Sequence, residues 1–284
     1  MKTACFLLAT WIWIAATPAR AQAPVPMLPD IQRVVTAGKL VVALGSEDID
    51  PMVSTDAEGR LGGFDVDLAR ALAHLLGVKT EFRRNAETPD AIVATVAKGE
   101  ADIGISLLSA TAARARHVLF TRPYATQPLT AFINRTRALH FRGRCPSGAE
   151  ISAAARTPDQ VGVQEEGAAA AWIREVVPEA KLKEFAELEE LFAAVREGTA
   201  MLTVQGEIPA RRLLKKHPAA SIQLRLCVLD TRPDHIAIAV RPDAPGLVRW
   251  IDAFLQERSV FYDADTLGRH EGTWTFRMGD PAAR

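Results

Sequence analysis

The sequence is poor in the side chains that metal sites and nucleophilic active sites use most often. Its 284 residues include only three cysteines and six histidines, and the histidines form neither a close pair nor a His-Glu-x-x-His motif. The Gly-x-Ser-x-Gly motif and the phosphate-binding P-loop are also missing. The sequence therefore argues against the enzyme classes that these motifs define, and it predicts no metal and no cofactor.

An excess of charge of one sign is missing as well. The chain carries 34 basic and 34 acidic residues, and no stretch gathers the basic ones into a stripe. Proteins that bind nucleic acid or anionic membranes usually show such a stripe. We therefore predict no nucleic-acid partner.

Long apolar runs are confined to the first residues. Lys2 precedes an apolar run from Cys5 to Ala16, and Pro18 to Ala21 ends it with small residues, as a cleaved signal peptide does. A single membrane anchor is the alternative, but the run is shorter than the ~20 residues of a spanning helix. We predict export with cleavage near Ala21. The cleavage point has no cysteine, so the sequence does not indicate a lipid anchor.

Export leaves two cysteines, Cys145 and Cys227, because Cys5 lies in the predicted signal peptide. Two cysteines in an oxidising compartment favour a disulfide. Two buried thiols remain the alternative.

The rest of the chain predicts two α/β halves of similar construction. In the first half, a strand at Leu40–Leu44 precedes a helix within Gly63–Val78, and a second strand runs to Phe82. Asp65 and Asp67 would cap the start of that helix. A joint of helix, glycine and strand occurs at Ala97–Ile105 and again at Arg196–Val204, about a hundred residues later.

Local signals predict three further elements. A helix is expected to start at Pro89, with Thr88 as its cap, because proline suits the first helical position. Strands are expected at Lys181–Phe185 and Ile222–Leu229.

Three segments carry a resemblance to a known family. They are Gly63–Ala71 (Gly-Phe-Asp-Val-Asp-Leu-Ala-Arg-Ala), Ser106–Arg114 and Val118–Tyr124. Together they resemble the periplasmic amino-acid-binding proteins that feed ABC importers, solute-binding protein family 3. The resemblance implies a two-lobed periplasmic-binding-protein-like α/β fold of type II, with two hinge crossings near 125–128 and 232–235. The implied division is a signal peptide (1–21), a linker (22–29), lobe one (30–126 plus 235–284) and lobe two (127–234).

The resemblance also implies a ligand site between the lobes. In the family an arginine after a Ser/Thr-rich turn holds the ligand's α-carboxylate, and Arg114 occupies that position, with Ser109 and Thr111 in the turn. A guanidinium holds a carboxylate well through two parallel hydrogen bonds. The full set of predicted ligand-binding residues is Arg114, Ser109, Thr111, Leu107, Asp50, Ala168, Gly206 and Glu207.

The sequence departs from the family where the ligand's ammonium group should bind. Gly206 stands where the family has an aspartate, and Ala168 stands where it has a hydroxyl residue. Asp48, Asp50 or Glu207 could replace the aspartate. Our leading interpretation of the departure is a ligand that bears a carboxylate and no ammonium.

The predicted function is capture of a small amino acid or related organic acid for ABC import, by a monomer that closes about its hinge and engages a permease. One alternative is a periplasmic sensor or accessory protein without a transport role. The other is a dehydratase of prephenate or arogenate. The residue that would serve as its acid is Pro209, which cannot transfer a proton.

Overall fold

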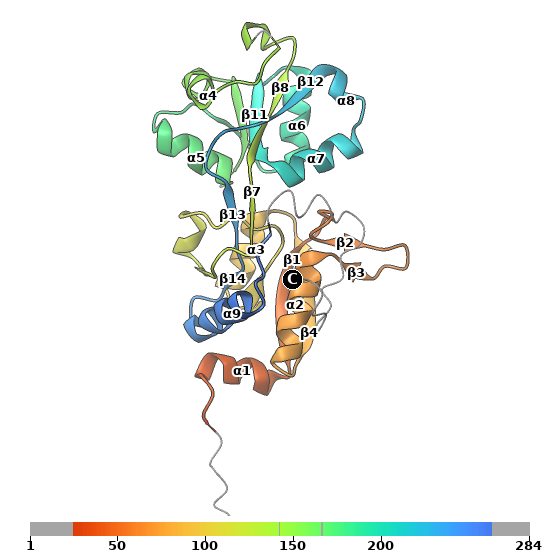
Figure 1. Cartoon of the computed structure of the whole chain (residues 1–284), viewed down its shortest axis with the longest axis vertical. Coiled ribbons are helices and arrows are strands. Elements are labelled where there is room, and N and C mark those ends of the chain that lie inside the picture. Colours follow the sequence, from red (N-terminus) through yellow and green to blue (C-terminus); the bar gives the residue numbers. More distant parts are fainter. Residues whose placement is uncertain (1–24, 142, 166, 263–284) are drawn as a thin grey trace, which may run out of the picture.

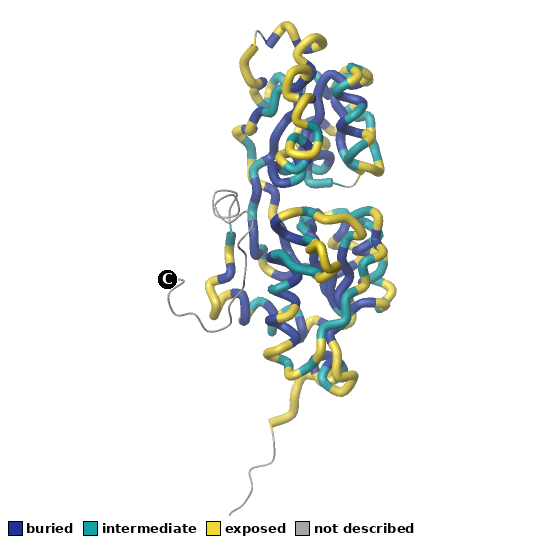
Figure 2. The backbone as a smooth tube through the Cα atoms, turned by 90° about the vertical axis from the view of Figure 1, so that its right-hand side faces the viewer, coloured by how far each residue is buried: buried dark blue, intermediate teal, exposed yellow. Residues whose placement is uncertain are grey.

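The chain folds into two lobes stacked along the long axis of the molecule and joined by two extended segments (Figure 1). This computed structural model describes residues 25–262 except 142 and 166. The predicted signal peptide, most of the predicted linker, and the tail after Tyr262 lie outside the described residues. Each lobe is organised around its own five-stranded sheet, and each sheet has its own buried apolar interior (Figure 2).

Lobe one is built on a sheet with the strand order β4-β1-β5-β14-β6. Its strands are β1 (Lys39–Gly45), β4 (Lys79–Ala86), β5 (Ile103–Gly104), β6 (Leu119–Phe120) and β14 (Ala239–Val240), and β2 (Ser54–Thr55) pairs with β3 (Leu61–Gly62) in a separate hairpin. Its helices are α1 (Pro29–Ala37), α2 (Phe64–Leu75), α3 (Pro89–Ala97), the short 3₁₀ helix η1 (Arg114–Arg116) and α9 (Pro245–Glu257). β1 runs parallel to both β4 and β5, as expected for repeated βαβ units.

Lobe two repeats this plan with the strand order β10-β9-β11-β8-β12. Its strands are β8 (Leu129–Asn134), β9 (Val161–Gln164), β10 (Lys183–Phe185), β11 (Leu202–Gly206) and β12 (Leu224–Val228). Its helices are η2 (Leu139–Phe141), α4 (Gly148–Ala155), α5 (Ala168–Val176), α6 (Leu188–Glu197), α7 (Glu207–Lys216) and α8 (Ala220–Gln223). A disulfide joins Cys145, just before α4, to Cys227 in β12.

The two crossings between the lobes form a short antiparallel ribbon. β7 (Ala125–Gln127) pairs with β13 (Asp234–Ile236), so that Gln127 lies opposite Asp234. Tyr262 also bonds to this ribbon, because its carbonyl accepts from the amide of Thr126. The ribbon is the place where one lobe can rotate against the other.

The start of α2 differs from the prediction. Gly63 is the N-cap, and Asp65 makes no cap bond, because its side chain is buried and bonds to residues far along the chain. Gly63 has φ +99°, and a β-carbon there would lie 2.6 Å from the carbonyl oxygen of Met52. Only glycine therefore allows the 50–52 loop to pack directly against the start of α2.

Two predicted elements of lobe two also change. The segment 222–229 was expected to be one strand, but its first residues belong to α8, and β12 begins at Leu224. The strand predicted from Lys181 begins at Lys183. Both strands begin two residues later than expected, which is within the usual spread of one or two residues at the end of an element.

Candidate functional site

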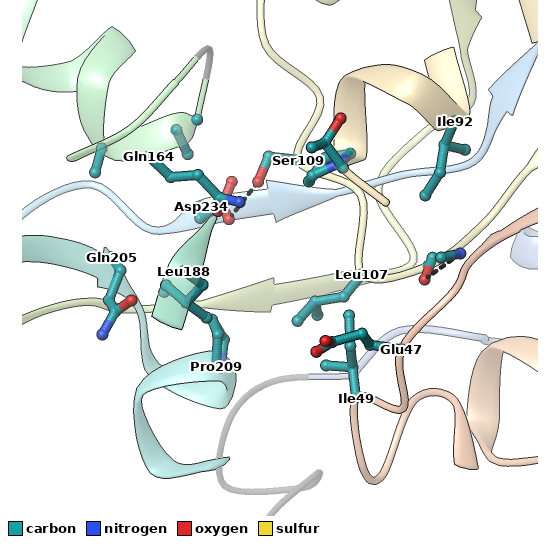
Figure 3. Close-up of a pocket in the computed structure, with 18 of the residues that line it drawn as sticks. Glu47, Ile49, Ile92, Leu107, Ser109, Gln164, Leu188, Gln205, Pro209 and Asp234 are labelled. Carbon is teal, nitrogen blue, oxygen red and sulfur yellow. Dashed lines mark hydrogen bonds between the residues drawn. The ribbon is translucent and has the colours of Figure 1, made fainter. Parts of the chain in front are cut away.

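A cleft lies between the two lobes, with the hinge ribbon at its floor. It encloses about 1020 Å³, part of it open to solvent, and residues of β1, α3, β9, β11 and α7 line it together with the hinge. Figure 3 shows side chains from both lobes facing this space, among them Glu47 and Leu107 from lobe one and Gln205 and Pro209 from lobe two.

Arg114 lies in the wall that lobe one contributes. Its side chain is only 4% exposed, and its Nε donates to Asp90 Oδ1 at 2.8 Å while Nη1 donates to the carbonyl of Ser109 at 3.0 Å. Asp90 sits in the first turn of α3. Nη2 makes no hydrogen bond within the described chain, so the outer edge of the guanidinium, Nη1 with Nη2, can still receive a carboxylate.

The neighbouring cleft residue Leu107 is held by Asp65. Leu107 adopts φ +49°, an unusual value for a residue with a side chain. Its amide donates to Asp65 Oδ2 at 2.7 Å, and the hydroxyl of Tyr124 donates to Oδ1 at 2.7 Å. Burial raises the pKa of Asp65 to about 7, against the effect of these two donors. Asp65 therefore supports the shape of the binding loop instead of capping a helix.

A second charged group, Asp234, lies at the floor of the cleft. Its side chain is buried, and Oδ2 accepts from Ser109 Oγ at 2.8 Å (dashed in Figure 3) and from Gln127 Nε2 at 3.1 Å. Burial raises the pKa of Asp234 to about 6, although the nearby Arg114 guanidinium opposes that rise. Asp234 and Arg114 thus place opposite charges on the same cleft.

Gln127 occupies the space next to Gly206, where the family has its aspartate. A β-carbon on Gly206 would meet three atoms of the Gln127 side chain at 2.4–2.6 Å. Gln127 is held in place because its Oε1 accepts from the amide of Ile208 while its Nε2 donates to Asp234. Gly206 is therefore matched to Gln127, and an aspartate does not fit at this position without a change at residue 127.

The mouth of the cleft is acidic. Glu47 and Glu87 come from lobe one and Glu187 from lobe two, and all three line the cleft at exposed positions. Partial burial, together with repulsion from Glu47, Glu87 and Glu190, raises the pKa of Glu187. Arg212 of α7 crosses this mouth and bonds to Glu47 Oε2 at 2.6 Å and to the carbonyl of Asp48.

The structure brings together five of the eight predicted site residues. Leu107, Ser109, Arg114, Ala168 and Gly206 line the cleft. The other three are not among the lining residues. Thr111 caps the turn by accepting from the amide of Arg114, Asp50 lies 3.7 Å from Lys215, and Glu207 pairs with Arg211 one turn along α7.

Sequence reasoning missed several polar residues of the cleft, among them Gln127, Gln205 and Asp234. Both amide atoms of Gln205 are buried without a hydrogen-bond partner, and the residue is 6% exposed. Buried polar atoms of this kind normally find a partner, and a ligand is the natural one in a cleft. The available signal was an aspartate and a glutamine in the two predicted crossings, which meet at the cleft floor.

The fold and this site define a two-lobed solute-binding protein. The chain matches the model of bacterial extracellular solute-binding proteins, family 3, over residues 41–263 and belongs to that family. Within the described residues, none of the helices has the length and apolarity needed to cross a bilayer.

Two curated relatives are similar in sequence. The chain is 25% identical over 211 residues to a probable ABC transporter arginine-binding protein, ArtJ, of Chlamydia trachomatis, which covers 73% of this chain and 76% of that protein. It is 32% identical over 87 residues to a probable histidine-binding protein of Neisseria gonorrhoeae, a match to about a third of each chain (31% and 32%).

Solved structures of amino-acid-binding proteins share the fold. An arginine-binding protein from T. maritima is similar with a TM-score of 0.63 and 25% identity, over 81% of this chain and 93% of that one. An ancestral amino acid-binding protein, a precursor of cyclohexadienyl dehydratase, is similar with a TM-score of 0.62 and 25% identity, over 84% and 96%. The predicted family and two-lobed fold are confirmed.

Proposed function

We propose that this protein captures an amino acid in the periplasm and delivers it to an ABC permease. The observation that carries the proposal is the buried guanidinium of Arg114 in the wall of a cleft between two lobes. Asp90 and the carbonyl of Ser109 orient this guanidinium, which leaves its outer edge for the ligand's α-carboxylate. Closure about the β7–β13 ribbon then completes the site from lobe two.

The comparisons support an amino acid over a plain carboxylate. The relatives carry names of arginine- and histidine-binding proteins, and one is named as part of an ABC transporter. Import, export by a cleaved signal peptide and a monomeric state are parts of the same proposal.

The acidic mouth of the cleft favours a ligand with a positively charged far end. Glu47 and Glu87 repel the carboxylate of Glu187, and a cation beside Glu187 would relieve that repulsion. The name of the T. maritima protein gives arginine as its ligand, so L-arginine is the first ligand to test.

A catalytic role has one point in its favour, the similarity to a precursor of cyclohexadienyl dehydratase. That neighbour is itself described as an amino acid-binding protein. In this chain Pro209 stands at the position of the expected acid and lines the cleft. Since proline has no proton to transfer, we propose binding without catalysis.

Titration calorimetry with L-arginine and a panel of other amino acids tests the proposal. We expect at least one amino acid to bind saturably with one-to-one stoichiometry. Replacement of Arg114 by alanine should weaken that binding roughly a hundredfold, because a charge-assisted pair of hydrogen bonds is lost.

Arg116→Ala is the matched control. Arg116 lies in the same 3₁₀ helix, but it is exposed and does not line the cleft. We expect it to bind as the wild type does. Tight binding of an amino acid that survives Arg114→Ala contradicts the proposed role of the guanidinium.

A further inference from the structure

We propose that Asp234, in the hinge ribbon, holds the α-ammonium group of the ligand in place of an aspartate in lobe two. The inference rests on the proposed function, because it assigns one half of the same ligand. It also replaces the interpretation that the ligand lacks an ammonium group.

In lobe two, the side-chain amide of Gln127 stands where a side chain at position 206 would lie. The space beside Gly206 is filled by Gln127, whose atoms lie 2.4–2.6 Å from where a β-carbon would stand. Gln127 in turn donates to Asp234 and lies opposite it in the ribbon. The residue that excludes an acid from position 206 therefore also orients an acid at position 234.

The three carboxylates suggested by sequence are engaged elsewhere. Asp48 bonds to Arg84 and Thr55, Glu207 bonds to Arg211, and Asp50 lies nearest to Lys215. None of the three lines the cleft. The other acids that line it, Glu47, Glu87 and Glu187, are exposed, whereas Arg114 and Asp234 are buried.

Asp234 has the geometry that an ammonium group needs. Oδ2 accepts two hydrogen bonds, whereas Oδ1 accepts none from the described residues. Ser109 links the two charges of the site, because its hydroxyl donates to Asp234 and its carbonyl accepts from Arg114. Asp234 and Arg114 form no direct ion pair among the described residues. Both charges therefore remain available to a ligand.

An α-amino acid carries its carboxylate and ammonium on one carbon, which matches two opposite charges placed on either side of Ser109. The ammonium would also lower the free-energy cost of ionising Asp234. A buried carboxylate is costly to ionise alone, and a cation brought by the ligand removes that cost.

Paired ligands give the test. Wild type and Asp234→Asn are titrated with L-arginine and with its desamino analogue, δ-guanidinovalerate, at pH 7.5. We expect the wild type to prefer arginine, and Asp234→Asn to lose roughly ten- to a hundredfold in arginine affinity while its affinity for the analogue changes little. If another amino acid in the panel binds more tightly than L-arginine, that amino acid and its desamino analogue replace the arginine pair in this test.

Asp230→Asn is the matched control, since Asp230 precedes the same ribbon and is exposed. It should keep the wild-type preference. A second variant tests the exchange of positions: Gly206→Asp combined with Gln127→Ala and Asp234→Asn should regain the preference for arginine, because it returns a carboxylate to lobe two.

Each remaining outcome decides a different point. An Asp234→Asn protein that still prefers the amino acid over its analogue overturns the inference and leaves the proposed function standing. A wild type that binds only desamino acids overturns both the inference and the proposed amino-acid ligand. A wild type that binds neither class overturns the proposed function itself.

Discussion

Two buried carboxylates, Asp65 and Asp234, lie in and behind the wall of the cleft. Asp65 and Asp234 are both buried, and burial raises the pKa of each. Asp65 supports the Leu107 loop from behind, whereas Asp234 faces the cleft. The two acids of the site region therefore have different tasks, one structural and one proposed for the ligand.

The stability of the protein should depend on pH through Asp65. Its pKa rises from 3.8 to about 7 on folding, so the folded state holds a proton that the unfolded state has released. We expect the free energy of unfolding to fall as pH rises between about 4 and 7, by about 1 kcal/mol per pH unit, and to level above that range. Asp65→Asn should remove the part of this fall that extends to about pH 7, whereas the part that Asp234 contributes between about pH 4 and 6 should remain. Urea unfolding at a series of pH values measures both parts.

Asp67→Asn serves as the control, because Asp67 lies in the same helical turn and pairs with Arg70 at the surface. Equal pH slopes for the wild type and for Asp65→Asn count against the raised pKa of Asp65.

Among the elements, lobe two has a covalent tie across 82 residues that lobe one lacks among its described residues. Cys145 lies in the segment before α4, and Cys227 lies in β12, at the edge of the lobe-two sheet. The bond therefore closes a loop that contains α4, β9, α5, β10, α6, β11, α7 and α8. Its effect on stability should be confined to this lobe.

We expect the double change Cys145→Ala with Cys227→Ala to destabilise lobe two by about 4 kcal/mol, because the unfolded chain regains the entropy of a long loop. Hydrogen exchange resolves the lobes: amides of β8, β9 and β11 should lose protection, while those of β1 and β5 should keep it. Equal losses in both lobes contradict a local effect.

At the scale of the whole molecule, the relation between the lobes depends on a few contacts. Apart from the ribbon, Arg212 of α7 reaches Glu47 and the carbonyl of Asp48 across the mouth of the cleft. Closure that buries a ligand must keep or replace this ion pair. The contact therefore favours, in the free protein, the lobe arrangement of this structure over more open ones.

Arg212→Ala should open the free protein. A partly exposed ion pair contributes about 0.5–1 kcal/mol, enough to shift the population of lobe arrangements a few-fold. Small-angle scattering without ligand should show a larger radius of gyration than the wild type, and saturating ligand should restore compaction. Arg174→Ala, which removes an ion pair to Glu184 inside lobe two, should leave the radius unchanged. An unchanged radius in Arg212→Ala contradicts a role for this contact in closure.

Much of this architecture could be predicted from local pattern. The strand at Leu40–Leu44, the helix after Gly63 and the helix starting at Pro89 each appear in the structure within a few residues of the predicted bounds. Periodicity, glycine stops and proline at a first helical turn are local signals, and they agree here with the tertiary packing.

The sequence by itself determined the family, the two-lobed fold and the arginine that faces the cleft. Only the tertiary structure decided where the negative charge of the site lies. Gln127 and Asp234 are more than a hundred residues apart, and neither belongs to a recognisable motif. They become partners because the two crossings pair in one ribbon, and the bulk of Gln127 then explains the glycine at position 206. Steric exclusion and long-range pairing act between segments that are distant in sequence, so local pattern could not reveal them.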